Sequence, residues 1–215
     1  MTELRITEIF YSLQGETRTV GLPTVFVRLT GCPLRCVYCD TEYAFHGGEK
    51  HSLDGVLGAV EGYQPRYVTV TGGEPLAQRE ACNELLQALC DRGYEVSLET
   101  SGALSVADVD PRVVKVLDLK TPLSGEMHRN DYKNVQYLDI HDQVKFVICG
   151  REDYDWMRFK LDELSLAGRV GEILLSPSYG QMDATELAEW ILADRLPVRL
   201  QLQLHKLLWN DAAGH

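Results

Sequence analysis

The hydrophobic pattern of this chain repeats one unit, in which a short run rich in β-branched residues precedes a polar loop and a stretch with apolar residues at helical spacing. The runs that predict strands are Thr24–Thr30, Tyr67–Thr71, Glu95–Glu99, Val113–Leu119, Gln143–Ile148, Glu172–Leu175 and Val198–Leu204. The stretches that predict helices are His51–Glu61, Gln78–Arg92, Glu126–Tyr137, Asp153–Leu166 and Ala184–Asp194, whereas Ser105–Asp110 is too short for a full helix. Alternation of this kind predicts a parallel sheet covered by helices.

The number of repeated units fits a barrel that does not close. A complete eight-unit barrel typically needs about 250 residues, and the 215 residues of this chain leave room for about six units. We therefore expect one compact α/β domain over residues 1–215, built as a partial (β/α)6-type, TIM-like barrel.

The unusual residues of the chain stand directly after the predicted strands. A cysteine-rich loop follows the first strand, TGGEP the second, ETSG the third and DLKTP the fourth, while SPSYG follows the sixth and QLHK ends the last. In a parallel barrel the carboxyl ends of all strands face the same side, where active sites form. These loops are therefore predicted to meet at one mouth.

Composition and charge argue against several classes of function. Hydrophobic residues make up 45% and charged residues 25% of the chain, the balance of an ordinary soluble globular protein. The net charge of −11 argues against nucleic-acid binding, because gripping a phosphate backbone needs clustered Lys and Arg. No stretch approaches the roughly 20 apolar residues of a membrane helix, and the acidic start MTELRITEIFYS does not resemble a signal peptide. A cytoplasmic protein with no membrane partner is the expectation.

Three of the six cysteines are predicted to be structural. Cys82 and Cys90 lie in the helical pattern ACNELLQALC, and Cys149 ends the apolar run VKFVIC. Buried free thiols are the better interpretation for these positions, since a disulfide framework is unusual in a cytoplasmic chain of this size.

The other three cysteines, Cys32, Cys36 and Cys39, stand close together in GCPLRCVYCD. Three thiolates are one ligand fewer than a tetrahedral metal or a cubane cluster needs, which leaves one position for something that reacts. A structural zinc site completed by His46 is the alternative. Such sites usually draw paired ligands from two separate knuckles, and no second Cys or His pair lies nearby in this sequence.

The TGGEP segment has a physical explanation of its own. Gly72 and Gly73 permit the backbone to approach a ligand without a Cβ in the way, so their peptide groups can bind a charged amino-acid group. A plain strand-to-helix turn is the alternative, because Gly and Pro often mark such loops.

With Tyr38 before the last cysteine, the Cys-x3-Cys-x2-Cys spacing resembles the signature of the radical S-adenosylmethionine (SAM) superfamily. TGGEP is similar to the Gly-Gly-Glu-Pro motif of that superfamily. The resemblance implies one [4Fe–4S] cluster per chain, held by Cys32, Cys36 and Cys39, with SAM on the fourth iron.

A narrower resemblance covers most of the chain. FYSLQGET, VFVRLTGC, CDT and QLQLHKLLW are similar to segments of the 7-carboxy-7-deazaguanine synthase family. Thr17 stands where that family usually has Gly, and DLKTP replaces the Ser-Pro-Lys of many relatives, with Lys120 retained. The resemblance implies a carbon–nitrogen lyase of queuosine biosynthesis, which contracts the ring of 6-carboxy-5,6,7,8-tetrahydropterin to 7-carboxy-7-deazaguanine with loss of ammonia.

The resemblance also implies which residues contact this pterin substrate. The implied contacts are Leu13, Gln14, Gly15, Glu16, Arg28, Thr71 and His205. A carboxylate such as Glu16 suits the guanidine-like donor edge of a pterin. Arg28 is placed to pair with the substrate carboxylate, although a structural salt bridge would also satisfy an arginine on an apolar strand. His205 is either a substrate contact or a histidine whose ring nitrogens simply have hydrogen-bond partners in the core.

The SAM and magnesium contacts are implied in the same way. For SAM they are Tyr38, Asp40, Gly73, Ser101, Asp118, Leu119, Lys120, Ser176, Pro177, Ser178 and Tyr179. For Mg²⁺ the resemblance implies Thr41, whose hydroxyl would act with substrate oxygens and water. A hydroxyl that caps the loop is the alternative for Thr41.

The family further implies a flavodoxin-type electron donor and a homodimer. Two other functions stay open at this point. A glycyl-radical-enzyme activase shares the cluster but acts on a protein, and SLQGE, CDT and QLHK argue against it. A zinc-stabilised binding protein without catalysis is the second alternative.

Overall fold

The computed structural model describes residues 2–210 and 214, so residues 211–213 and 215 of the C-terminal tail lie outside the described part. Nine strands form one sheet in the order β3-β1-β2-β4-β5-β6-β7-β8-β9. Their bounds are β1 Glu3–Leu13, β2 Pro23–Leu29, β3 Glu49–Ser52, β4 Tyr67–Gly72, β5 Glu95–Thr100, β6 Val114–Asp118, β7 Gln143–Ile148, β8 Glu172–Pro177 and β9 Arg199–Leu200. Neighbours from β2 to β9 are parallel, while β1 is antiparallel to β2 and β3. No ladder joins β3 to β9 in the described residues, so the predicted open barrel is confirmed.

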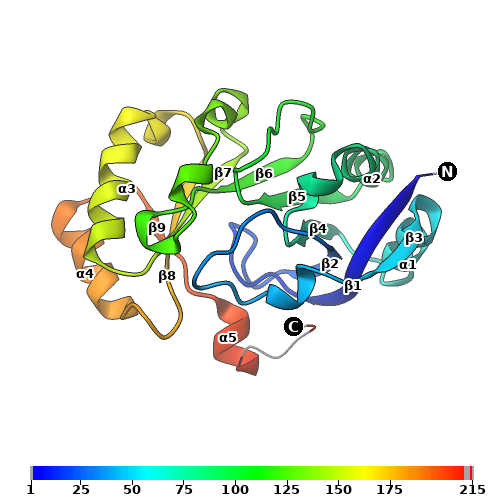
Figure 1. The fold of residues 1–215 in the computed structure, drawn as a ribbon, viewed down its shortest axis with the longest axis horizontal. Coiled ribbons are helices and arrows are strands. Elements are labelled where there is room, and N and C mark those ends of the chain that lie inside the picture. The colour runs from blue at the N-terminus through cyan, green and yellow to red at the C-terminus, as the bar shows by residue number, and fades with distance from the viewer. Residues whose placement is uncertain (1, 211–213, 215) are drawn as a thin grey trace.

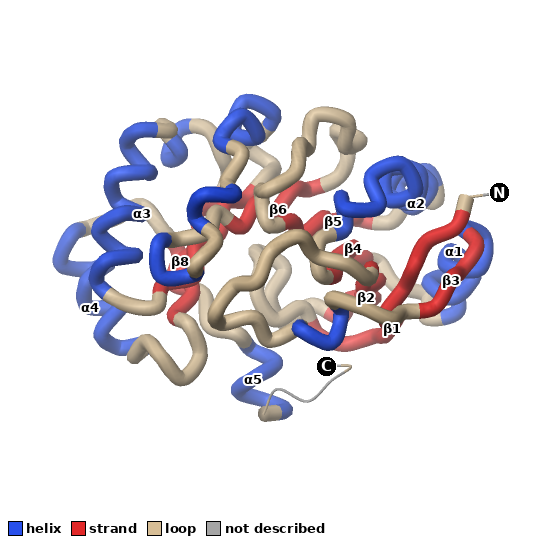
Figure 2. The backbone as a smooth tube through the Cα atoms, in the orientation of Figure 1, coloured by secondary structure: helices blue, strands red, loops and turns tan. Residues whose placement is uncertain are grey.

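In the described residues the strands alternate with α-helices and 3-10 turns, and the last helix, α5, follows β9. The helices are α1 Leu53–Gly62, α2 Arg79–Asp91, α3 Arg151–Glu163, α4 Ala184–Asp194 and α5 Leu204–Trp209. The 3-10 turns are η1 Glu42–Ala44, η2 Pro75–Gln78, η3 Pro122–Ser124, η4 Met127–Arg129, η5 Tyr132–Tyr137 and η6 Leu166–Gly168. Helices α1 to α4 lie around the outside of the curved sheet, and loops gather inside the curve (Figures 1 and 2). Within the described residues, no helix has both the length and the apolar character needed to cross a membrane.

Side-chain alternation along the strands separates an apolar layer from a polar one. On β5, Val96 and Leu98 are buried in the hydrophobic core, which also contains the apolar face of α2. Glu99, next to Leu98, faces the opposite side and lines a cavity inside the barrel. Successive residues of a strand point to opposite faces, so each strand supplies both layers. The core therefore lies between sheet and helices, and the barrel interior is left for polar side chains.

The helix predicted over Glu126–Tyr137 is wrong, because this segment forms the separate turns η4 and η5. Asn130 breaks it: its Oδ1 accepts from the Lys120 N–H at 2.9 Å, and its Nδ2 donates to the Lys120 carbonyl at 2.8 Å. The Asp131 carboxylate then accepts from the Lys133 N–H and starts η5. Asn and Asp side chains that bond to backbone groups in this way compete with helix formation.

Most of the other predicted elements end a few residues away from the observed ones, and in two cases part of the segment has a different type of structure. The helix predicted from His51 begins at Leu53, since Ser52 caps it and residues 49–52 pair with β1 as the strand β3. The strand predicted over Val198–Leu204 ends at Leu200, and the chain then turns into α5. The prediction of no helix over Ser105–Asp110 is confirmed.

Candidate functional site

A cavity of about 710 Å³ opens where the carboxyl ends of the parallel strands meet. The predicted site residues that line it are Leu13, Gln14, Gly15, Glu16, Arg28, Cys32, Cys36, Tyr38, Cys39, Asp40, Thr41, Thr71, Gly73, Ser101, Asp118, Lys120, Ser178, Tyr179 and His205. Loops that are far apart in the sequence thus converge on one space, as the barrel topology requires.

Three predicted residues do not line this cavity: Leu119, Ser176 and Pro177. Leu119 is fully buried in the hydrophobic core, and its N–H donates to the Lys145 carbonyl. Ser176 and Pro177 continue the buried strand β8 instead of belonging to the loop after it. Strand alternation turns the side chain of Leu119 away from the interior, which its two neighbours face.

The cysteine loop is braced by its own backbone and by Arg35. The Cys39 N–H donates to the Cys36 carbonyl at 3.1 Å, and Arg35 Nη1 donates to the Cys32 carbonyl at 2.8 Å. The Arg35 guanidinium also lies 4.1 Å from the ring centre of Phe45. Burial raises the pKa of all three thiols, and that of Cys36 reaches about 11. A metal that binds here must therefore displace thiol protons.

The spacing of the three thiols fits a cluster better than a single ion. Thiolates around one zinc ion lie about 4 Å apart, because each Zn–S bond is about 2.3 Å long. Among the described residues, the set of three potential ligands within 4.8 Å of one another is Glu16, Asp40 and His205, and it contains no cysteine. The three thiols are therefore not gathered as closely as the ligands of one zinc ion, which agrees better with the wider spacing of iron–sulfur ligands.

Gly72 and Gly73 give the cysteine loop room to pass. A Cβ on Gly73 would lie 2.4 Å from the Gly31 carbonyl oxygen and 2.8 Å from Cβ of Cys32. A Cβ on Gly72 would lie 2.3 Å from the Leu29 carbonyl oxygen. The Gly73 N–H also donates to that Leu29 carbonyl at 3.1 Å. The two glycines are therefore needed for packing of the chain itself, whether or not a ligand also approaches them.

Glu74 ties the TGGEP segment to the next loop. Its carboxylate is fully buried and accepts from the Leu76 N–H, the Thr100 hydroxyl, and both the N–H and the hydroxyl of Ser101. A buried carboxylate is tolerable only with such compensation. The Ser101 hydroxyl therefore donates its hydrogen bond to Glu74, so it can only accept a hydrogen bond from a ligand.

Tyr38, Asp118 and Lys120 form a polar wall beside the cysteines. Lys120 Nζ donates to Asp118 Oδ2 at 2.8 Å and lies 5.6 Å from the ring centre of Tyr38. Burial alone would lower the pKa of Lys120, but the Asp118 carboxylate holds it well above its usual value. The Tyr38 hydroxyl and Asp118 Oδ1 are buried without a hydrogen-bond partner in the described residues. Buried polar atoms normally have partners, so this wall fits a polar ligand.

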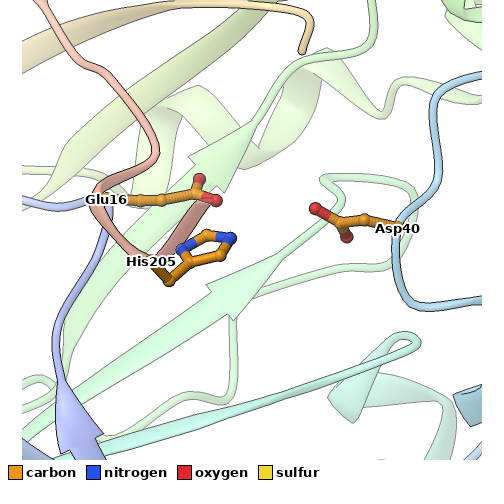
Figure 3. A group of neighbouring side chains, drawn as sticks. All are labelled: Glu16, Asp40 and His205. Atoms are coloured by element: carbon orange, nitrogen blue, oxygen red, sulfur yellow. The ribbon is translucent and has the colours of Figure 1, made fainter. Parts of the chain in front are cut away.

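Glu16 lies where the two ends of the chain meet (Figure 3). Its Oε1 accepts from Gln203 Nε2 at 2.7 Å, and its Oε2 accepts from Lys145 Nζ. Burial would raise the pKa of Glu16, but the Lys145 ammonium and these hydrogen bonds hold it below the ordinary value. The opposite carboxylate, Asp40, pairs with Lys206 Nζ at 2.9 Å. Glu16 and Asp40 are thus both held as anions with a lysine partner.

His205 lies on helix α5, whereas the sequence predicts that it directly follows a strand over Val198–Leu204. Its ring points toward Glu16 and Asp40 (Figure 3). Leu204 N–H donates to the Gly15 carbonyl at 3.0 Å, and a Cβ on Gly15 would lie 2.4 Å from His205 Nδ1. Gly15 therefore permits the C-terminal helix to close over the Glu16 loop.

Arg28 forms a structural salt bridge, which was the alternative interpretation of this residue in the sequence. Its Nε donates to Glu8 Oε1 at 2.7 Å, and the Tyr43 hydroxyl donates to the same oxygen at 2.8 Å. The terminal nitrogens of Arg28 donate to no acceptor within residues 2–210 and 214, and Arg28 lines the cavity. A salt bridge on one edge therefore leaves the other edge of the guanidinium for an anionic ligand.

Thr41 directs its hydroxyl to Asp40 Oδ1 at 2.8 Å. It stands at the N-cap of η1 but makes no side-chain cap hydrogen bond. The loop-capping alternative is therefore not what the structure contains.

Sequence reasoning missed three charged residues that line the cavity: Glu99 on β5, Lys145 on β7 and Lys206 on α5. Glu99 accepts from Gln14 Nε2 and from the Thr71 hydroxyl, each at 3.2 Å. Burial, and then the charge of Glu16, raise the pKa of Glu99. For Lys145 the signal was a charge within a mainly apolar strand, since an inward-facing charge must find a partner. Glu99 gave no such signal, because its strand β5 contains several polar residues.

The structural cysteines are partly as predicted. All six cysteines are free, and Cys82 is fully buried. Cys90 and Cys149 are only partly buried, because each stands at the end of its element.

Comparison with known proteins identifies the group to which this architecture is related. The family model for the radical SAM superfamily matches residues 26–118. A 7-carboxy-7-deazaguanine synthase of Chlorobaculum tepidum is 45% identical, covering 98% of this chain and 97% of that protein. The enzyme of that name from Koribacter versatilis is 42% identical, covering 96% of this chain and 97% of that protein.

Solved structures agree with the sequence relatives. The crystal structure of QueE from Escherichia coli superposes with a TM-score of 0.73 at 27% identity, covering 94% of this chain and 95% of that one. Streptococcus suis SuiB bound to its precursor peptide SuiA has a TM-score of 0.58 at 13% identity, covering 80% of this chain and 46% of that one. That second likeness shows the fold alone.

Proposed function

Because the chain belongs to the 7-carboxy-7-deazaguanine synthase family of radical SAM enzymes, we propose that it contracts 6-carboxy-5,6,7,8-tetrahydropterin to 7-carboxy-7-deazaguanine with loss of ammonia. The observation that carries this proposal is a single cavity with three thiols on one wall and the Glu16 carboxylate on another. Neither the activase nor the zinc-protein alternative is favoured by the relatives that the chain matches.

Cys32, Cys36 and Cys39 are the residues that would hold the [4Fe–4S] cluster. Bound cluster and SAM supply radical chemistry, which the cofactors carry and the protein orients. The side chains of Tyr38, Asp118, Lys120, Ser101 and Tyr179 would meet SAM, and the unpartnered atoms of Tyr38 and Asp118 support this assignment.

The pterin would lie between Glu16 and Arg28. The Glu16 carboxylate, held ionised by Lys145, suits the guanidine-like donor edge of the ring. The free edge of the Arg28 guanidinium suits the substrate carboxylate. Gln14 would mainly position the Glu16 loop, because its amide already bonds to Thr69, Glu99 and the Glu16 N–H.

Only a few protein oxygens would coordinate Mg²⁺. The Thr41 hydroxyl and the neighbouring Asp40 carboxylate are the oxygens at hand beside the predicted substrate position. Mg²⁺ typically completes its shell with substrate oxygens and water. We also propose a flavodoxin-type electron donor, a homodimer and a cytoplasmic location, which the family resemblance supports.

Anaerobic turnover tests the proposed function. Protein reconstituted with iron and sulfide should carry about four irons per chain and convert the carboxytetrahydropterin, with SAM, a reductant and Mg²⁺, to carboxydeazaguanine detected by mass spectrometry. Cys36→Ser is the control and should lose both cluster and product. A fully cluster-loaded protein that forms no product would overturn the proposal.

A further inference from the structure

Lys145 is a buried cation inside the barrel that the predicted contacts do not use. It lies in the middle of β7, between the interior-facing positions Gln143 and Val147, and only 14% of its side chain is exposed. Burial would lower the pKa of Lys145, but Glu16 and then Asp118 and Glu99 raise it, so the side chain is a fixed ammonium.

The ammonium of Lys145 has more N–H donors than acceptors in the described residues. A lysine ammonium carries three N–H donors. In the described part of the chain it donates to Glu16 Oε2, and no second acceptor receives a hydrogen bond from it. Lys145 lines the cavity, so its remaining donors face the space in which a ligand would lie. A donor without a protein partner favours a ligand that brings an acceptor.

The edge of a 2-amino-4-oxo heterocycle carries three polar groups in a row. The 2-amino group and the N3–H are donors, and the C4 oxygen beside them is an acceptor. Glu16 and Lys145 lie in direct contact and offer the reverse order, a carboxylate that accepts and then an ammonium that donates. Gln203 holds the other Glu16 oxygen and so fixes the plane of the carboxylate.

We propose that the Glu16–Lys145 pair reads the pterin edge, with Lys145 donating to the C4 oxygen while Glu16 accepts from N3–H and the 2-amino group. This inference rests on the proposed function and assigns Lys145 as a specificity-determining residue for it. The deazaguanine product keeps the same amino-oxo edge, so the pair holds one edge of the ring while the other is rebuilt. A site made to hydrogen-bond a given substrate group discriminates strongly against an analogue that lacks it.

A 4-thioxo analogue of the carboxytetrahydropterin tests the pair, because it keeps both donors and replaces only the acceptor oxygen by a weakly accepting sulfur. Dissociation constants are measured anaerobically by calorimetry on cluster-loaded protein without reductant. A charge-assisted hydrogen bond contributes about 1.5–3 kcal/mol, so we expect the wild type to bind the oxo compound roughly 10- to 100-fold more tightly than the thioxo compound.

Lys145→Met should weaken binding of the oxo compound by roughly 10- to 100-fold and reduce the oxo preference to within about threefold. Lys133→Met, which removes an exposed lysine from η5, is the matched control and should keep wild-type affinity and preference. Lys145→Arg should restore part of the preference, and Glu16→Ala should lose binding of both compounds.

Iron content, SAM affinity and circular dichroism establish that each variant is folded. If Lys145→Met does not fold, Lys145→Gln and the wild-type preference still decide the question. A wild type without oxo preference, or a Lys145 variant that retains it, would sink the inference even if turnover succeeds. Absence of turnover by the wild type would instead overturn the proposed function.

Discussion

At the scale of single residues, most charged side chains of the cavity form ion pairs, and the acid Glu99 does not in the described residues. Glu16 pairs with Lys145, Asp40 with Lys206, Asp118 with Lys120 and Arg28 with Glu8. Glu99 has hydrogen bonds from neutral groups but no ion pair in residues 2–210 and 214. Removing a partner from a buried pair is costly, so the paired residues are interdependent, whereas Glu99 is separable.

Glu99→Gln should therefore stabilise the protein at neutral pH. The pKa of Glu99 is raised in the folded protein, so the folded state binds a proton that the unfolded state has released. Wild-type stability must then fall as pH rises through the ordinary glutamate range, and level off above the raised pKa. The glutamine variant lacks this loss and should gain on the order of 1 kcal/mol at neutral pH.

Urea unfolding of wild type and Glu99→Gln at a series of pH values measures this difference. The two proteins should have equal stability near pH 4, where Glu99 is protonated in both states, and diverge above it. Glu95→Gln, on the same strand but exposed, is the control. A difference that does not change with pH would show that burial of the charge is not its cause.

The sequence located the loop residues of the site well and the strand residues poorly. Cys32 and Asp40 lie in the loop after a predicted parallel strand, so barrel topology alone predicts that they lie at the mouth. Glu16 follows a strand that was not predicted, and only the family resemblance implied its place in the site. Glu99 and Lys145 lie within strands, where the direction of a side chain depends on register. A charge in such a strand can face either side until the strand's neighbours are known.

At the scale of elements, regular periodicity predicted the structure and local hydrogen bonding altered it. The strand Gln143–Ile148 and the helix Ala184–Asp194 have the bounds that the sequence predicts. The antiparallel strand β1 was not predicted, since its mixed polar pattern has no clean period. The helix predicted over Glu126–Tyr137 failed because Asn130 bonds to the backbone of Lys120, a contact between two elements that no single segment contains.

The tight crossing of β4 and the cysteine loop makes a prediction about Gly73. An alanine there would place Cβ 2.4 Å from the Gly31 carbonyl, so backbone must move. We expect Gly73→Ala to cost about 1–3 kcal/mol of stability and to lower iron bound per chain, because the displaced segment begins at Cys32. Thermal unfolding and iron analysis after reconstitution measure both effects.

Gly58→Ala is the matched control, since nothing lies within 4 Å of a Cβ at this position of helix α1. Alanine is the better helix former by roughly 0.5–1 kcal/mol, so this variant should be as stable as wild type or more stable. Normal iron binding by Gly73→Ala would contradict a role for this glycine in shaping the cluster loop.

At the scale of the whole molecule, the site exists only because the two ends of the chain meet across an open barrel. The Glu16 loop follows the first strand, and Gln203, His205 and Lys206 come from the last segment (Figure 1). Two contacts join them, Gln203 to Glu16 and Leu204 N–H to the Gly15 carbonyl, and Lys206 also pairs with Asp40 beside the cysteine loop. An open sheet has no strand to close this side, so α5 takes that place.

Truncation after Leu202 should therefore separate the fold from the pterin site. The sheet stays complete, because β9 ends at Leu200 and the Gln201 N–H still bonds to the Leu175 carbonyl. Cluster loading should be close to that of the full chain, because the lost contacts of Gln203, Leu204 and Lys206 go to Glu16, Gly15, Asp40 and Tyr179. SAM affinity should fall less than pterin affinity, since only Asp40 and Tyr179 of the proposed SAM contacts lose Lys206. Affinity for the carboxytetrahydropterin should fall by on the order of 100-fold. Without Gln203 the plane of the Glu16 carboxylate is no longer fixed, and without α5 the mouth of the cavity is no longer covered.

A chain that ends at Asn210 keeps α5 and is the control. Calorimetry on both proteins gives the comparison. Equal pterin affinity for the two would mean that α5 covers the barrel without organising the site, whereas loss of iron from the shorter chain would mean that the two ends of the chain also hold the cysteine loop.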